Sequence, residues 1–258
     1  MKKNKKWIRL LLILFFALLI VNLTIYNQLK LNVHDSFEAS RLQKIWSTSR
    51  MERDSYEFQS KVVRKGKYAL KITLKYGDKV EFSNTKDKDT ERDELLESRS
   101  LYALENNKYD YQFSLFLPDS FPILPVRLVL AQWKQDCPLC PCHNYSPIVA
   151  LRYVSGRLFV TLQTDSVQHK LFALNEEIRG RWLDFRFIIK FSKDNNGEIL
   201  AFLSENEIVN YKGVTSYLDD CKILSKKNKY YFKMGLYRDR MSDPMTIYID
   251  EYSKKRIN

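Results

Sequence analysis

Most of the chain alternates between apolar and polar residues, and a period of two is the pattern of β-strands that bury one face. In Tyr68–Tyr76, for example, Leu70, Ile72 and Leu74 share one face. The same alternation predicts strands over Asp110–Leu117, Val149–Val154, Arg157–Gln163, Leu183–Phe191, Glu198–Leu203, Glu207–Tyr211 and Met245–Tyr252. Many short strands separated by turn residues are typical of a β-sandwich or jelly roll, so we predict an all-β domain.

The segment Tyr230–Asp239 separates apolar from polar side chains with particular clarity. Its apolar face, which suits a core, carries Phe232, Met234 and Leu236. The opposite face carries two phenols, an ammonium group and a glycine: Tyr231, Lys233, Gly235 and Tyr237. A glycine on a strand face leaves room for another group to approach, so we expect this face to form a polar binding floor. The alternative is a half-exposed strand whose tyrosines only cover the surface, since tyrosine is common in strands.

Two further segments place polar side chains on one strand face in the same way. In Glu91–Glu97, the alternation puts Arg92 and Glu94 on one face. After the apolar residues that begin at position 128, Gln132 and Lys134 share a face. A guanidinium group and an amide can both hydrogen-bond a carboxyl group, so these strands are suited to an anionic ligand.

Together the three segments resemble the signature of one group of polysaccharide lyases, which includes heparin lyase I, glucuronan lyases and alginate lyases. That signature is an Arg-x-Glu-Leu-Arg strand, a Gln-x-His strand and a Tyr-Phe-Lys-x-Gly-x-Tyr strand, in this order. Here the strands read Arg92-Asp93-Glu94-Leu95-Leu96, Gln132-Trp133-Lys134 and Tyr231-Phe232-Lys233-Met234-Gly235-Leu236-Tyr237. The chain departs from the signature where Leu96 replaces the second arginine and Lys134 replaces the histidine.

The resemblance extends roughly from Phe37 to Tyr252 and implies a fold and a reaction. The implied fold is a concanavalin-A-like β-jelly roll with a substrate groove on its concave sheet. The implied reaction is cleavage of an acidic, uronic-acid-containing polysaccharide by β-elimination. Such a reaction neutralises the C6 carboxylate, removes the C5 proton with a base and protonates the departing O4 with an acid.

Four residues are predicted to carry this chemistry. Arg92 and Gln132 suit the carboxylate. By resemblance, Tyr237 protonates the leaving oxygen, and in some family members the same tyrosine also abstracts the proton. Lys134 stands at the histidine position, where it would act either as the base or as a second group that neutralises the carboxylate. An unperturbed lysine is mostly charged at neutral pH, but neighbouring cations could lower its pKa.

Other residues are expected to bind or orient the substrate. Lys233 and Tyr231 would contact the anionic polymer, and Glu94 would orient Arg92 or Lys233 by pairing with it. Arg152 lies on a strand face where it would either line the groove or remain solvated.

Four positions outside the signature are weaker candidates. His143 and His169 are possible replacements for the missing histidine, although a lone histidine is more often structural. Arg238 and Asp239 follow the tyrosine strand and are predicted to shape the rim of the groove.

Two other functions fit parts of the pattern. A non-catalytic protein that binds an anionic polysaccharide would explain the departures at Lys134 and Leu96. A retaining glycoside hydrolase would need two carboxylates about 5 Å apart. Asp93 and Glu97 share a strand face but are separated by about 13 Å of strand rise, and Leu95 between them indicates a buried or convex side.

Charge supports a polyanionic partner. The chain has 258 residues, enough for one sizeable β-domain, and its formal net charge is +12. About +7 remains once five N-terminal cations are set aside, and an excess of this size attracts polyanions. No basic nucleic-acid-binding motif is present, so an acidic polysaccharide is the expected partner and nucleic acid is not.

Residues 1–30 are expected to form a unit separate from the polysaccharide-lyase-like domain at 31–258. Five basic residues, the last of them Arg9, precede an apolar run from Leu10 to about Tyr26. This run is near the minimum length for a bilayer-spanning helix, and the basic residues favour a cytoplasmic N-terminus. No small-x-small cleavage site follows, which favours an uncleaved signal anchor and an extracytoplasmic domain in the periplasm or at the cell surface. Secretion after cleavage is the alternative.

The cysteines are expected to be structural. They are Cys137, Cys140, Cys142 and Cys221. Outside the cytoplasm an even number of cysteines favours two disulfides, one of them joining the 137–142 loop to Cys221. The Cys-x-x-Cys spacing next to His143 leaves a zinc site as the alternative. No cofactor is predicted for the reaction, and a structural zinc or calcium ion is left open.

Overall fold

The computed structural model describes residue 7 and residues 11–21, 32–82, 89–136, 146–218 and 228–257. The strands are β1 (Val33–Asp35), β2 (Trp46–Ser47), β3 (Tyr56–Gln59), β4 (Ala69–Leu74), β5 (Thr90–Glu97), β6 (Ala103–Leu104), β7 (Lys108–Phe116), β8 (Leu128–Asp136), β9 (Val149–Val154), β10 (Arg157–Leu162), β11 (His169–Leu174), β12 (Trp182–Lys190), β13 (Gly197–Leu203), β14 (Asn206–Gly213), β15 (Lys229–Asp239) and β16 (Met245–Ile257). A single-turn 3₁₀ helix, η1 (Arg99–Leu101), precedes β6.

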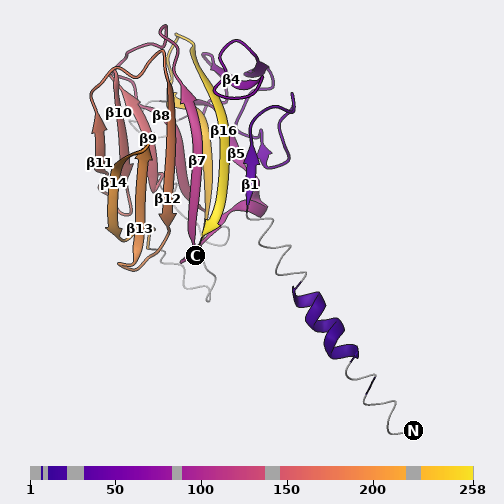
Figure 1. Ribbon diagram of the computed structural model, residues 1–258. Helices are drawn as coiled ribbons and strands as arrows, with labels where there is room; N and C mark the ends of the chain where they lie inside the picture. The colour runs from indigo at the N-terminus through magenta and orange to yellow at the C-terminus, as the bar shows by residue number, and fades with distance from the viewer. Residues whose placement is uncertain are drawn as a thin grey trace.

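These strands form two antiparallel sheets that pack face to face (Figure 1). The first, here the β7 sheet, has the order β14-β13-β12-β7-β16-β4-β3, with β1 paired to β16. The second, the β15 sheet, has the order β11-β10-β9-β8-β15-β5-β2, with β6 paired to β15. The predicted all-β jelly-roll sandwich is confirmed. Strands distant in sequence, such as β5, β8 and β15, become neighbours in it.

The predicted hairpins are present, and one predicted strand end is wrong. The chain turns between β9 and β10 at Ser155-Gly156, and β13 pairs with β14. The last strand was expected to end at Tyr252 but continues to Ile257. Glu251 has a φ of 54°, and the pairing with β7 shifts register there. This bulge reverses the alternation, so the period-two pattern stops before the strand does.

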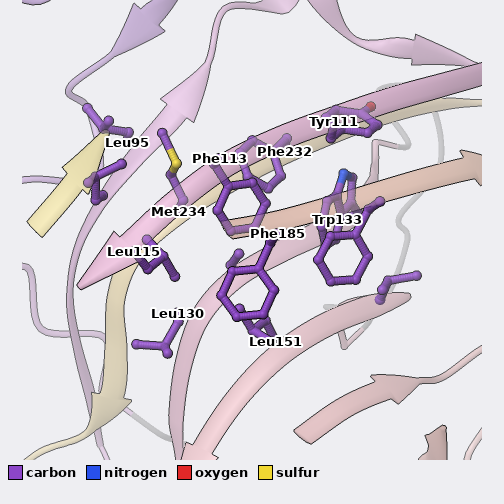
Figure 2. Packing of buried hydrophobic residues seen from close by; sticks show 14 of the residues in the cluster. Leu95, Tyr111, Phe113, Leu115, Leu130, Trp133, Leu151, Phe185, Phe232 and Met234 are labelled. Atoms are coloured by element: carbon purple, nitrogen blue, oxygen red, sulfur yellow. The ribbon is translucent and has the colours of Figure 1, made fainter. Parts of the chain in front are cut away.

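Aromatic side chains from both sheets fill the core, as Figure 2 shows. Trp133 on β8 lies 4.9 Å from the Phe232 ring on β15 and 4.7 Å from the Phe187 ring on β12. Phe113 on β7 packs on Phe232 with ring centroids 5.5 Å apart. Burying large rings in this interdigitated way strongly stabilises the sandwich. It also determines which faces of β8 and β15 point outward.

Ion pairs are buried between the sheets as well. The Lys254 Nζ atom lies 2.9 Å from Glu97, and the Tyr252 hydroxyl donates to the same carboxylate. Arg238, fully buried, pairs with Glu91 at 2.6 Å. The prediction that Arg238 shapes the groove rim is therefore wrong. Arg238 follows the outward-facing Tyr237, so its side chain points into the sandwich.

Residues 11–21 form an exposed helix near the N-terminus (Figure 1). The predicted hydrophobic helix before the β-domain is confirmed. Within the described residues, no helix combines the length and the apolar character that crossing a bilayer requires. Most of the expected anchor lies outside the described residues, so anchoring and export stay predictions.

Candidate active site

The polar residues of the three signature strands lie on the outward face of the β15 sheet. β5, β15 and β8 are adjacent there, and their core-facing residues include Phe232 and Met234. Three cross-strand pairs on the outward face bring together most of the predicted site residues: Tyr237 with Arg92, Lys233 with Gln132, and Tyr231 with Lys134. A site assembled from residues 92 to 237 thus results directly from strand order.

Gly235 has a different role from the one expected. Its φ is 144°, and a Cβ atom built on it would lie 2.3 Å from the backbone oxygen of Asp93 and 2.8 Å from the Cα of Glu94. The space that this glycine leaves is occupied by the neighbouring strand β5, so it does not admit a substrate. Glycine is needed here because β15 and β5 approach too closely for any side chain.

Glu94 links three of the predicted site residues. Its carboxylate, 1% exposed, accepts a hydrogen bond from the Lys233 Nζ atom at 2.8 Å and another from the Gln132 amide. The Arg92 guanidinium lies 3.8 Å from the same carboxylate. Burial lowers the pKa of Lys233 although Glu94 opposes this change. Glu94 therefore orients both cations, in agreement with the predicted pairing.

Arg92 and Tyr237 are in contact. The guanidinium carbon of Arg92 lies 4.2 Å above the centre of the Tyr237 ring, and Lys233 and Arg127 lie 5.8 and 5.7 Å from it. Arg92 also forms an ion pair with Glu81. The phenol is thus surrounded by cations that attract its ring and would stabilise negative charge near it.

Lys134 has an unusual environment for a lysine. Burial is the main cause that lowers the pKa of its ammonium group to about 8, and the positive charges of Lys233 and Arg92 contribute to this value. An amine with this pKa is partly neutral near physiological pH, so it can accept a proton. The neighbouring cations therefore help to lower the pKa of Lys134, as expected.

Arg152 on β9 and Tyr231 on β15 belong to the same sheet as Lys134. Arg152 on β9 is buried, and its Nε atom donates to the Thr161 hydroxyl at 3.1 Å. Burial lowers the pKa of Arg152 to about 10, with a contribution from Arg127. The alternative of a solvated Arg152 is therefore wrong. Tyr231 stacks on Tyr102 with ring centroids 5.3 Å apart, and burial raises the pKa of Tyr231 to about 12.

Several residues at this face were missed in the sequence. Arg127 precedes β8 and pairs with Asp239 at 2.7 Å, so Asp239 does lie at the edge of the site. Glu81 and Arg50 lie between strands, where no periodicity marks them. Tyr102 follows the short helix η1. Loop residues such as these give no signal, because their direction depends on tertiary contacts and not on alternation.

The remaining candidates do not join this group. His169 is exposed on β11, the edge strand of the sheet, so it does not replace the missing histidine. His143 lies outside the described residues, as do the four cysteines: Cys137, Cys140, Cys142 and Cys221. The disulfides and the alternative zinc site stay predictions. The described part of the chain holds no group of three or more metal-ligating side chains.

The two carboxylates considered for a retaining hydrolase do not lie on this face. Asp93 and Glu97 are both buried on the inner side of β5. Burial raises the pKa of Asp93 to about 8, with Asp78 nearby adding to the effect. Glu97 is occupied by Lys254. Neither side chain can reach a polymer lying on the outward face.

The jelly-roll sandwich thus presents arginine, lysines, an amide and a tyrosine on one sheet face. The sequence model of the polysaccharide lyase family matches residues 37–253. The chain therefore belongs to the polysaccharide lyase family, and the predicted enzyme class is confirmed.

Solved structures with the same fold include two polysaccharide lyases and one glucanase. An endo-β-1,4-glucuronan lyase from the fungus Trichoderma reesei is 17% identical, with a TM-score of 0.66 over 87% of this chain and 95% of that one. Alginate lyase A1-II′, of polysaccharide lyase family 7, is 15% identical, with a TM-score of 0.53 over 84% and 86% of the two chains. A β-glucanase catalytic domain from Podospora anserina is 12% identical, with a TM-score of 0.55 over 88% and 92%. The comparison with curated protein sequences gave no match. The fold is thus shared by different reactions, and the site must define the reaction.

Proposed function

We propose that this polysaccharide lyase cleaves an acidic, uronic-acid-containing polysaccharide by β-elimination, in a groove along the outward face of the β15 sheet. The observation that carries the proposal is an excess of positive charge on this face. Arg92, Lys134, Arg152 and Lys233 lie there, and the buried carboxylate among them is Glu94. Burial lowers the pKa of Lys134, Arg152 and Lys233, and a neighbouring cation contributes to each lowered value. A bound carboxylate would oppose both effects.

In our proposal, Arg92 and Gln132 hold the C6 carboxylate. Both contact Glu94, which keeps them side by side. Arg92 is now paired with Glu81, whose side chain is 51% exposed. In our proposal the substrate carboxylate takes the position of Glu81, and charge neutralisation by Arg92 makes the C5 proton acidic enough to remove.

Lys134 and Tyr237 then divide the two proton transfers. Neutral Lys134 takes the C5 proton, the C4–C5 double bond forms, the C4–O4 bond breaks, and O4 takes the phenolic proton of Tyr237. With a pKa of about 8, roughly a tenth of Lys134 is neutral at pH 7. In the other assignment, Tyr237 makes both transfers and Lys134 only neutralises the carboxylate. Lys134→Ala distinguishes them, because loss of the base abolishes kcat whereas loss of a charge mainly raises KM.

The relatives favour uronic acid polymers. The two lyases named above act, by their names, on glucuronan and on alginate. The test is a panel of polyglucuronate, alginate and a glycosaminoglycan, with a neutral β-glucan as control, assayed by the ultraviolet absorbance of the unsaturated product. We expect absorbance from at least one uronate polymer and none from the glucan. New reducing ends from the glucan without absorbance would instead indicate hydrolysis, and binding without any product would indicate the non-catalytic alternative.

We also propose that the β-domain works outside the cytoplasm, attached by the N-terminal segment. Basic residues ending at Arg9 before an apolar run support this orientation. The full chain should sediment with membranes, and a chain without residues 1–30 should not. Equal distribution of the two would contradict the anchor.

A further inference from the structure

The outward face of the β7 sheet, on the other side of the sandwich from the proposed catalytic group, carries a hollow of its own. Its volume is about 680 Å³, within the range of ligand-binding sites. Strands β7 and β12 border it through residues such as Gln112 and Asp184, and the segment before β4 adds Arg64. The proposed catalytic group lies on the β15 sheet, so this hollow is not an extension of that site.

Three aromatic side chains form a row across the β7 sheet beside this hollow. Trp182 on β12, Phe116 on β7 and Tyr248 on β16 are cross-strand neighbours on three strands that lie side by side (Figure 1). The Phe116 ring centroid is 5.5 Å from that of Trp182 and 5.7 Å from that of Tyr248, and all three side chains are half-buried. Phe116 is the next outward residue of β7 after Ser114, which lines the hollow, and this step is about 7 Å along the strand. The row therefore gives the hollow an apolar surface at one end.

A polar pair lies beside the Trp182 ring. Asp184 is the next outward residue on β12, and the Arg64 Nε and Nη2 atoms donate to its two oxygens at 3.0 and 2.8 Å. The side chains of Arg64 and Asp184 are 45% and 39% exposed, so the pair is accessible to a ligand. A guanidinium group next to a carboxylate presents donors and acceptors side by side, which matches adjacent hydroxyl groups of a sugar. A sugar ring can thus place its apolar face on the indole and its hydroxyl groups on this pair.

The charges of the hollow favour an uncharged ligand. Of the four lysines and arginines that line it, three have a carboxylate oxygen within 3.9 Å. The fourth, Lys255, stands directly across from Asp110 on β7. The hydrogen bonds between Arg64 and Asp184 raise the pKa of the arginine and lower the pKa of the carboxyl group. A further carboxylate would have to compete with Asp184 for Arg64, whereas a hydroxyl group can bond to the pair without separating it.

We propose that the outward face of the β7 sheet is a second carbohydrate-binding site, and that its ligand is a neutral saccharide. One sugar ring packs on Trp182, and its hydroxyl groups hydrogen-bond Arg64 and Asp184. The two sheets then hold two different glycans, an acidic one that is cleaved and a neutral one that is only bound. This site goes beyond the proposed function and does not depend on it.

The test is a calorimetric titration of the full chain with neutral hexasaccharides of glucose, mannose and xylose. The wild type should bind at least one of them with a Kd of about 1 mM or lower. Trp182→Ala should weaken this binding about tenfold or more, because the sugar loses its apolar support. Arg64→Ala, which changes an exposed side chain, should weaken it about threefold or more. Arg53→Ala, an exposed arginine outside the hollow, should match the wild type.

Variants of the two faces separate this site from the proposed active site. Lys134→Ala should leave the affinity for the neutral chain unchanged, and thermal unfolding shows whether each variant folds. If Trp182→Ala does not fold, Arg64→Ala decides alone. A wild type that binds none of the three hexasaccharides would overturn the proposal, as would wild-type affinity in the folded variants of the hollow. Weaker binding in Lys134→Ala alone would also overturn it, because the neutral chain would then lie on the β15 sheet. Failure of every uronate polymer to give unsaturated product would reject β-elimination and leave this site standing.

Discussion

The two sheets treat charge on their outward faces in opposite ways. On the β7 sheet, Arg64 pairs with Asp184 at 2.8 Å and Arg186 pairs with Asp110 at 2.8 Å, each with a carboxylate of its own. On the β15 sheet, Arg92 and Lys233 share one buried carboxylate, Glu94. These two arginines of the first face each have their own carboxylate, whereas two cations of the second face share Glu94.

A hollow by itself does not mark the site, whereas the burial of cations distinguishes the two faces. The β7 sheet has a hollow of about 680 Å³ lined by Arg64, Asp184 and Arg186. Hydrogen bonds to their carboxylate partners raise the pKa of both arginines. Burial lowers the pKa of Lys134 and Lys233 on the other face. A lowered cation pKa is a cost that a bound anion removes, so it indicates a binding site better than volume does.

The largest expected effect is loss of turnover in Tyr237→Phe. If Tyr237 protonates the leaving oxygen, kcat should fall by a factor of about 10² to 10⁴, since that is the usual contribution of a general acid. Polymer affinity should change little, because the ring and its contact with Arg92 remain. Tyr248→Phe removes a phenol from the β7 sheet and should leave kcat unchanged. A Tyr237→Phe enzyme that forms unsaturated product at the wild-type rate would contradict the assignment.

The second effect concerns the stability of the folded protein. Glu94→Gln leaves Lys233 buried without its counter-charge, and breaking a buried pair in this way costs roughly 3–5 kcal/mol of unfolding free energy. Asp184→Asn breaks a half-exposed pair and should cost about 1 kcal/mol or less. Chemical denaturation measures both.

The pH dependence of this cost gives an internal check. Without Glu94, the pKa of Lys233 falls further below its ordinary value, so the unfolded chain binds more protons than the folded chain. The stability of Glu94→Gln should therefore increase as pH rises toward the ordinary lysine pKa. Equal losses in Glu94→Gln and Asp184→Asn would mean that the two faces do not differ in charge compensation.

Alternation along the strands predicted part of the cationic site on the β15 sheet. The positions of its other residues depend on tertiary contacts. A period of two was enough to place Tyr237 and Arg92 on one outward face. It failed at Gly235, because only the pairing of β15 with β5 shows what fills the space. The period of two could not reveal Arg50, because Arg50 lies in a loop between strands. The inward direction of Arg238 did follow from the same alternation, but a charged residue is seldom expected in a core.

The smallest expected effect is a shift in the pH profile, and it tests Lys134 directly. The kcat/KM value reports the pKa of the free enzyme, so it should rise with pH to a midpoint of about 8 if neutral Lys134 is the base. Lys134→His should move this midpoint toward ~6.5, the ordinary histidine pKa, and should raise activity a few-fold at pH 7 because more of the base is neutral. Lys255→His, on the β7 sheet, should leave the midpoint at its wild-type value. A Lys134→His enzyme whose midpoint stays near 8 would restrict Lys134 to neutralising the carboxylate and would give both proton transfers to Tyr237.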